Sequence, residues 1–252
     1  MTIHQANFPD LRNQVVAITG GASGIGAAIV ESFHAQKAKV VFFDIDETAG
    51  QALADRLGDG VEFRALDLTD INALTEQFAQ AAKVFGDFDV LVNNAAHDDR
   101  HTIESVTAHY WRDRMAVNLD HQFFAAQAVI PGMKAKGAGS IINMGSIAWR
   151  IGLSEAPAYV VAKAAIEGLT RSLARELGPD GIRVNCLLPG FVRTQRQVDK
   201  WLTPEFEQRV LASQCLERLT EPEDIAAMVT MLASNVSRAF TNQTMVVDAG
   251  WT

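Results

Sequence analysis

Cysteine is scarce in this sequence: Cys186 and Cys215 are the only two among 252 residues. Two cysteines at this spacing exclude a disulfide framework and a cysteine metal site. Cys186 lies within the apolar run IRVNCLL, so we expect it to be a small core residue. We also predict no metal site at Asp98-Asp99, because no third ligand stands at a suitable spacing.

Positive charge is also in short supply. The chain has 22 Lys and Arg against 30 Asp and Glu, a formal net charge of −8, which argues against a nucleic-acid-binding surface. No apolar run is long enough to span a bilayer, and the N-terminal MTIHQANFPDLRNQ does not have the pattern of a signal peptide. We therefore expect a cytoplasmic protein without a membrane or nucleic-acid partner.

What is present is an alternation of short apolar runs with longer segments of helical period. The expected strands are 15–19, 40–44, 61–66, 89–93, 140–144, 182–188 and 244–249, and the expected helices are 24–36, 47–57, 70–85, 110–136, 158–177 and 221–233. Apolar strands without alternation, separated by helices, favour a seven-stranded parallel sheet with helices on both faces. We predict a single α/β domain over 1–252, in which the irregular segment 190–220 is an insertion that covers the substrate.

A glycine turn follows the first expected strand. Gly20, Gly24 and Gly26 in ITGGASGIG are spaced so that backbone can approach a pyrophosphate at the start of the next helix. A glycine cluster after a strand can also be an ordinary turn. The strand, the turn and the helix occur here in the order that a dinucleotide site requires.

Carboxylates and amides end the next three strands. Asp44 can accept hydrogen bonds from both adenosine ribose hydroxyls and would repel a 2′-phosphate, which favours NAD over NADP. Asp67 could reach the adenine amino group, and the asparagines of NNAA (93–96) could hold their loop away from the cofactor. The alternatives are a helix N-cap at Asp44, although Asp46 suits that position as well, and an ordinary turn at NNAA.

Tyr159 and Lys163 stand four residues apart on an expected helix, and Ser146 lies thirteen residues before the tyrosine. Residues at i and i+4 share a helix face, so the lysine ammonium should lower the pKa of the phenol and suit it to acid–base chemistry. The alternative is a surface Tyr and Lys on an amphipathic helix.

These motifs together resemble the short-chain dehydrogenase/reductase family: TGGASGIG (19–26), Asp67-Leu68, NNAA, Asn118, Ser146, Tyr159-x3-Lys163 and PGFVRT (189–194) occur in the family's order. The resemblance implies a Rossmann-like doubly wound fold. It implies that Tyr159 is the general base, Ser146 holds the reacting oxygen, Lys163 grips the nicotinamide ribose, and Asn118 holds a water. The implied NAD contacts are Gly20, Ser23, Gly24, Ile25, Gly26, Asp44, Ile45, Asp67, Leu68, Asn94, Tyr159, Lys163, Pro189, Gly190, Val192 and Thr194. Ala96 departs from the family's usual glycine, and we expect only a modest change in the pocket wall.

The resemblance also implies a homotetramer built on the helices 110–136 and 158–177. Ala162, Ala164, Ala165 and Gly168 form a small-residue face that would allow helices to approach closely. The alternative is that this face packs against the chain's own sheet.

Within the family, the strings HDDRH (97–101), GSIAWRIGL (145–153) and RTQRQVDKWLTPE (193–205) are similar to those of bacterial NAD-dependent sugar dehydrogenases of the D-xylose, L-arabinose and D-galactose type. The implied reaction is oxidation of an aldose at C1 to the aldonolactone. The expected substrate contacts are His97, Asp98, Ser146, Trp149, Tyr159, Gln195 and Arg196, with Asp99, Arg100, Arg150 and Trp201 nearby. Each polar loop residue could instead simply be solvated, and His97 could be a loop histidine without a role.

Two other functions remain open from the sequence. One is another activity of the same family, such as a 3-oxoacyl reductase or a secondary-alcohol or polyol dehydrogenase, against which Asp44 argues because biosynthetic reductases normally use NADPH. The other is a sensor that binds NAD without catalysis, against which the intact Ser146, Tyr159 and Lys163 argue.

Overall fold

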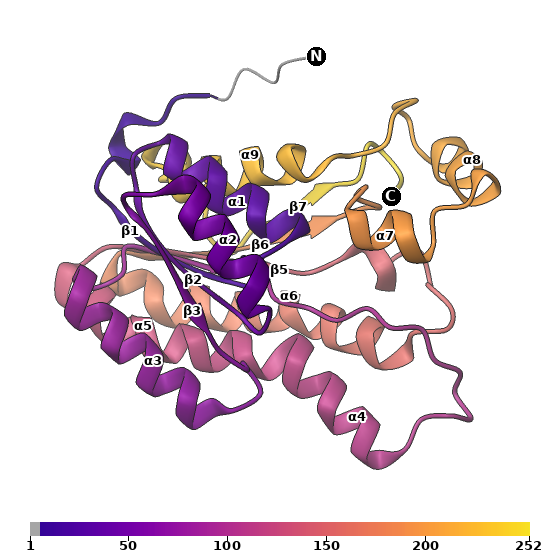
Figure 1. The fold of residues 1–252 in the computed structure, drawn as a ribbon, viewed down its shortest axis with the longest axis horizontal. Helices are drawn as coiled ribbons and strands as arrows, with labels where there is room; N and C mark the ends of the chain where they lie inside the picture. The colour runs from indigo at the N-terminus through magenta and orange to yellow at the C-terminus, as the bar shows by residue number, and fades with distance from the viewer. Residues whose placement is uncertain (1–5) are drawn as a thin grey trace.

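The fold is an α/β sandwich around one parallel sheet (Figure 1), described for residues 6–252 in a computed structural model. Within those residues seven strands form the sheet in the order β3-β2-β1-β4-β5-β6-β7, with every neighbouring pair parallel. The strands are β1 (Val15–Thr19), β2 (Lys39–Asp44), β3 (Val61–Ala65), β4 (Val90–Asn93), β5 (Gly139–Met144), β6 (Ile182–Pro189) and β7 (Thr244–Val247). The predicted Rossmann-like fold is confirmed, with strand ends within two residues of the predicted ones.

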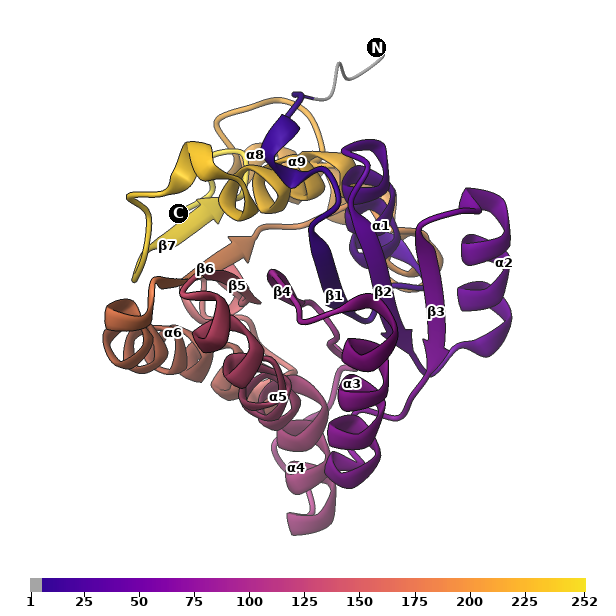
Figure 2. The same cartoon turned by 90° about the vertical axis from the view of Figure 1, so that its left-hand side faces the viewer.

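Helices cover both faces of the sheet (Figure 2). The elements are α1 (Gly24–Ala35), α2 (Glu47–Leu57), α3 (Ile71–Phe85), α4 (Ala108–Met115), α5 (His121–Lys136), α6 (Pro157–Leu177), α7 (Gln195–Lys200), α8 (Pro204–Ser213) and α9 (Pro222–Ala233). Successive residues of β1 point to opposite faces: Val16 and Ile18 pack with α1, α2 and α9, while Val15 and Ala17 pack with α3, α5 and α6. Because both faces are buried, the strands are apolar throughout.

The helix expected over 110–136 is interrupted. A π-helical turn, Ala116–Asp120, separates α4 from α5. Inside it the buried Asn118 side chain donates through Nδ2 to the Arg114 carbonyl oxygen at 2.9 Å. A side chain that enters the hydrogen-bond ladder in this way widens the turn. The hydrophobic period predicted the helix correctly but carried no sign of the interruption.

The segment 190–220, predicted only as an insertion, contains α7 and α8. Thr194 caps α7 by accepting from the Gln197 N–H at 3.3 Å, and Thr203 caps α8 by accepting from the Phe206 N–H at 3.2 Å. Thr203 is followed by Pro204 at the first helical position, a start signal that could have revealed α8 from the sequence. The two short helices lie together beside the carboxyl end of β6 (Figure 1).

Candidate active site

The residues singled out from the sequence lie where the parallel strands end. Gly20 follows β1, Asp44 ends β2, Asn94 follows β4, Ser146 follows β5, and Pro189 ends β6. In a parallel sheet these carboxyl ends share one edge, and the central break in strand order falls between β1 and β4. The fold therefore gathers the predicted cofactor and catalytic residues along one edge.

The glycine turn between β1 and α1 is closely packed. Gly20 and Gly24 have φ of +67° and +52°, a region that glycine tolerates best. A Cβ on Gly26 would lie 1.8 Å from the Gly20 carbonyl oxygen. Asn94 donates through Nδ2 to that same oxygen at 2.8 Å and so holds the turn to the end of β4.

The helix that follows the turn leaves its first N–H groups open to an anion. Its N-cap residue, Ser23, makes no side-chain capping bond within the described residues. Open N–H groups and the helix dipole favour a phosphate at such a terminus. A pyrophosphate therefore fits this turn, because backbone crowds where a side chain would stand and donors remain available.

Asp44 is fixed by backbone donors. Its Oδ2 accepts from the Ala22 N–H at 2.9 Å and its Oδ1 from the Asp46 N–H at 3.1 Å. Asp46 caps α2 by accepting from the Ala49 N–H at 3.0 Å, so the alternative of Asp44 as that helix's cap is excluded. Ile45 beside it is 71% exposed, which leaves an apolar side chain and a carboxylate together at the edge of the sheet.

The other expected cofactor residues border the same edge. Asp67 accepts from the Thr69 N–H and hydroxyl at 2.9 and 2.7 Å, and the next residue, Leu68, is buried. Thr194 lies against the glycine turn, since its Cγ2 is 3.1 Å from where a Cβ on Gly24 would stand. Gly190 and the buried Val192 continue from β6, and Gly190 has no room for a side chain beside Asp248.

Tyr159 and Lys163 lie on one face of α6, as the spacing predicted. The Lys163 Nζ stands 5.7 Å from the centre of the Tyr159 ring and donates to the Met144 carbonyl oxygen at 2.8 Å. Lys163 is 1% exposed, and burial lowers its pKa to about 8. The alternative of a surface Tyr–Lys pair is therefore wrong for the lysine.

The expected direction of the Tyr159 pKa is wrong for this structure. Burial raises that pKa to about 12, and hydrogen bonding to Ser146 acts in the opposite direction. Desolvation of the phenolate is the largest cause of this rise in pKa, and the ammonium of Lys163 is directed to the Met144 carbonyl. Ser146 also accepts from the Ala148 N–H at 3.1 Å, which fixes its hydroxyl at the end of β5.

Asn118 and a histidine that the sequence analysis did not single out lie next to this pair. Asn118 accepts through Oδ1 from the His97 N–H at 2.8 Å and donates through Nδ2 to the His97 carbonyl oxygen at 3.2 Å. His121, one turn later, is fully buried, and within the described residues neither of its ring nitrogens has a hydrogen-bond partner. Burial lowers its pKa to about 3, and Lys163 acts in the same direction.

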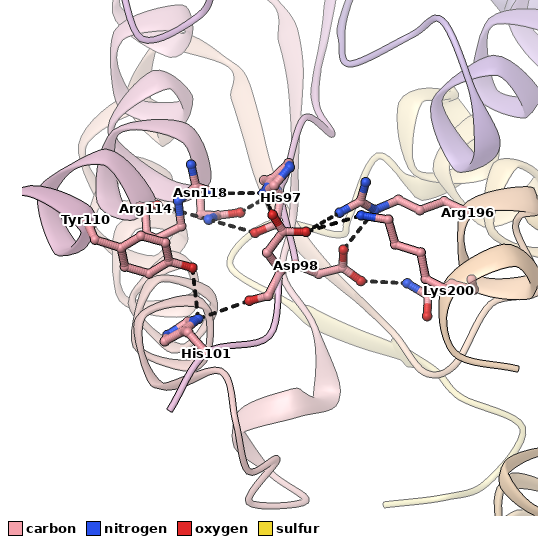
Figure 3. Close-up of polar contacts among 10 residues, drawn as sticks. His97, Asp98, His101, Tyr110, Arg114, Asn118, Arg196 and Lys200 are labelled. Atoms are coloured by element: carbon pink, nitrogen blue, oxygen red, sulfur yellow. Dashed lines mark hydrogen bonds and ion pairs between the residues drawn. The ribbon is translucent and has the colours of Figure 1, made fainter. Parts of the chain in front are cut away.

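Loop 97–101 and α7 lie opposite each other, and their charged side chains meet between them (Figure 3). Arg196 donates to Asp98 Oδ1 at 3.0 Å and to Asp99 Oδ1 at 2.8 Å, and Gln197 donates to Asp98 Oδ2 at 2.6 Å. Lys200 adds an ion pair to Asp99 at 3.5 Å. The predicted sugar contacts Asp98 and Arg196 are thus bonded to each other.

The remaining predicted substrate residues are held in different ways. His97 contacts Arg114 and lies 3.4 Å from Asp99, and burial lowers its pKa. Gln195 donates to Asp199 on its own helix at 2.7 Å. Trp149, 38% exposed, donates through its indole N–H to Glu167 at 2.9 Å, two turns beyond Tyr159, so its polar end lies along α6.

No helix of residues 6–252 is long and apolar enough to cross a membrane. No cluster of three or more His, Cys, Asp or Glu in that range could hold a metal ion.

Known proteins resemble this chain over nearly its whole length. A family model described as enoyl-(acyl carrier protein) reductase matches residues 20–252. A D-xylose 1-dehydrogenase of Caulobacter vibrioides is 48% identical over 98% of each chain. A probable galactose dehydrogenase of Rhizobium meliloti is 46% identical over 99% of each. A solved structure of a short-chain dehydrogenase/reductase family protein is 32% identical over 96% of this chain and 98% of its own, with a TM-score of 0.87.

Proposed function

This chain belongs to the short-chain dehydrogenase/reductase family of oxidoreductases, and from that premise we propose that it is an NAD-dependent aldose 1-dehydrogenase. It oxidises the C1 hydroxyl of a cyclic aldose, of the D-xylose, L-arabinose or D-galactose class, to the aldonolactone. The observation that carries the sugar assignment is the full-length similarity to two sugar dehydrogenases. The charged groups of loop 97–101 and α7 support it, because a polyol needs several donors and acceptors around it.

Three residues of the chain carry out the proton transfer in this proposal. Tyr159 removes the proton of the C1 hydroxyl, and Ser146 donates a hydrogen bond to the oxygen from which that proton leaves. Lys163 supplies a cation beside the ring, which favours the phenolate that burial disfavours. When bound, NAD would supply the hydride acceptor for C1, so that with the proton taken by Tyr159 the alcohol loses two electrons and two hydrogens in all.

The glycine turn and Asp44 would hold the cofactor. The proposal favours NAD over NADP because the Asp44 carboxylate would repel a 2′-phosphate, and no Lys or Arg stands in the glycine turn or at 45–46. Replacing Asp44 with Asn should lower kcat/KM with NAD by about tenfold or more, since hydrogen bonds to a charged group are stronger than neutral ones. The efficiency with NADP should rise or stay unchanged.

The test of the function is a ranked set of catalytic efficiencies. The purified protein is given NAD and D-xylose, L-arabinose, D-galactose, D-glucose or L-fucose, and NADH absorbance is followed. The matched variant Tyr159→Phe should bind NAD as the wild type does and lose about 100-fold to 10,000-fold in turnover. Reduction of a 3-oxoacyl thioester, with no aldose oxidised, would refute the sugar assignment.

The family's tetramer is also a proposal for this chain. Val161 on α6 and Phe123 on α5 are 47% and 41% exposed, and no atom of residues 6–252 lies within 4 Å of where a Cβ on Gly168 would stand. Ala162, in contrast, is fully buried within the chain. Sedimentation equilibrium tests the assembly: a monomer at micromolar concentration would contradict it.

A further inference from the structure

The helix that carries Tyr159 begins without a cap of its own. Its N-cap residue is Ala156, which has no side-chain acceptor, and the first helical residue is Pro157, which has no N–H. The first N–H that needs an acceptor therefore belongs to Ala158, directly before Tyr159. An uncapped first turn frays easily, and fraying here would move the catalytic phenol.

A histidine from a distant segment supplies the missing acceptor. The Ala158 N–H donates to Nε2 of His101 at 3.3 Å. The His101 backbone N–H donates to the Glu155 carbonyl oxygen at 2.7 Å, and Glu155 has a left-handed φ of +61°. His101 thus contacts the chain on both sides of the N-cap residue, through its ring and through its backbone.

The ring itself is held from two other directions (Figure 3). His101 Nδ1 lies 3.0 Å from the Asp99 carbonyl oxygen and 3.0 Å from the Tyr110 hydroxyl. The Tyr110 ring meets the imidazole edge-on, with 4.9 Å between centres. His101 therefore connects α4, the loop after β4 and the start of α6.

These partners specify one form of the imidazole. A backbone N–H can only donate, so Nε2 must be the unprotonated nitrogen; a backbone carbonyl can only accept, so Nδ1 must carry the proton. We propose that His101, as the neutral Nδ1–H tautomer, is the N-cap of α6 supplied from another part of the chain, and is thereby a positioning residue for Tyr159. The inference rests on the proposed role of Tyr159 as the acid/base.

The first test needs neither substrate nor cofactor. In ¹⁵N-histidine spectra of the full chain, His101 should appear as the neutral Nδ1–H tautomer. Assignment of the His101 signal comes from its loss in a His101→Gln variant. An Nε2–H tautomer or an imidazolium at neutral pH would overturn the proposal, whatever the enzyme's substrate is.

The second test separates positioning from general stability. His101→Phe keeps the ring contact with Tyr110 but has no acceptor, so kcat for the best aldose should fall about fivefold to thirtyfold, equivalent to the loss of about 1–2 kcal/mol of a helix cap. KM and Kd for NAD should not change. Hydrogen exchange at residues 158–160 should accelerate in this variant.

His101→Gln is the rescue variant, because the glutamine Oε1 can stand near the position of Nε2 and accept the same N–H. It should recover kcat to within about twofold of the wild type and restore slow exchange. His109→Phe on α4 is the matched control and should change neither quantity. The capping role would be refuted if His101→Gln lost as much kcat as His101→Phe while hydrogen exchange at residues 158–160 stayed as in the wild type. The proposed function would instead be refuted if the wild type oxidised none of the aldoses.

Discussion

The buried ammonium of Lys163 donates to the carbonyl oxygen of Met144 at 2.8 Å, and this bond joins α6 to the end of β5. Met144 lies two residues before Ser146, so the same strand end positions the serine hydroxyl and the lysine. Tyr159, one turn before Lys163, is fixed relative to both. The three side chains therefore share one rigid support, which is what acid–base chemistry at a defined oxygen requires.

Replacing Lys163 with Met should impair catalysis through the pKa of Tyr159. Burial already raises that pKa to about 12, and the variant removes the nearby cation that favours phenolate. We expect aldose oxidation at pH 8 to fall at least about 100-fold and to require higher pH. Initial rates from pH 6 to 10 measure this; Lys134→Met, at the exposed end of α5, should match the wild type. Equal pH profiles for wild type and Lys163→Met would contradict the prediction.

Replacing Gly26 with Ala should disrupt the nucleotide turn. Its Cβ would stand 1.8 Å from the Gly20 carbonyl oxygen and 2.8 Å from the Asn94 amide nitrogen, so the turn must move. Overpacking of this kind costs about 1–3 kcal/mol of stability, and NAD affinity should fall more than about tenfold. Thermal unfolding and NAD titration measure the two effects.

The matched control for that variant is Gly178→Ala. Gly178 has an ordinary φ of −55°, and in the part of the chain that the structure describes no atom lies within 4 Å of where its Cβ would stand. It should leave NAD affinity unchanged. Full NAD affinity in Gly26→Ala would show that the turn does not approach the cofactor.

The sequence was most informative where a local pattern determines structure. Apolar runs such as VVAIT predicted strands buried on both faces, and the four-residue spacing of Tyr159 and Lys163 predicted their shared face; both are borne out. The break at Asn118 was not predictable from the hydrophobic period, because it arises from one side chain bonding to its own helix and to His97.

Contacts between segments far apart in the chain could also not be predicted from the sequence. Asp98 and Arg196 were each expected to face a sugar, but they are 98 residues apart in the chain and bond to each other. The net direction of the Tyr159 pKa depends on how strongly burial opposes the nearby cation, which residue spacing cannot reveal. The direction of the Tyr159 shift was wrong for that reason.

The ion pairs between loop 97–101 and α7 should hold α7 against that loop. Arg196→Ala removes both bonds to Asp98 and Asp99. The pairs are partly exposed, so their coupling should be about 0.2–1 kcal/mol and should weaken with salt. We expect KM for the aldose to rise up to about fivefold while kcat changes little.

A double-mutant cycle of Arg196→Ala with Asp98→Asn at low and high salt measures that coupling. Arg209→Ala on α8, whose exposed guanidinium lies over the Phe206 ring, is the control. Additive effects of Arg196→Ala and Asp98→Asn at low salt would show that the pair does not hold α7.

His121 should make the fold sensitive to acid. Burial sets its pKa at about 3, whereas an imidazole in the unfolded chain titrates near about 6.5. As the pH falls, the unfolded chain takes up a proton at His121 before the folded chain does. The free energy of unfolding is therefore not reduced by His121 above about pH 6.5, and it decreases as the pH falls toward 3. Between pH 7 and 5 the free energy of unfolding should decrease by about 2 kcal/mol through this group.

Urea unfolding of the wild type and His121→Gln at both pH values should show a smaller decrease in the variant, and His109→Gln should behave as the wild type does. Equal decreases in wild type and His121→Gln would mean that His121 is not held neutral by the fold.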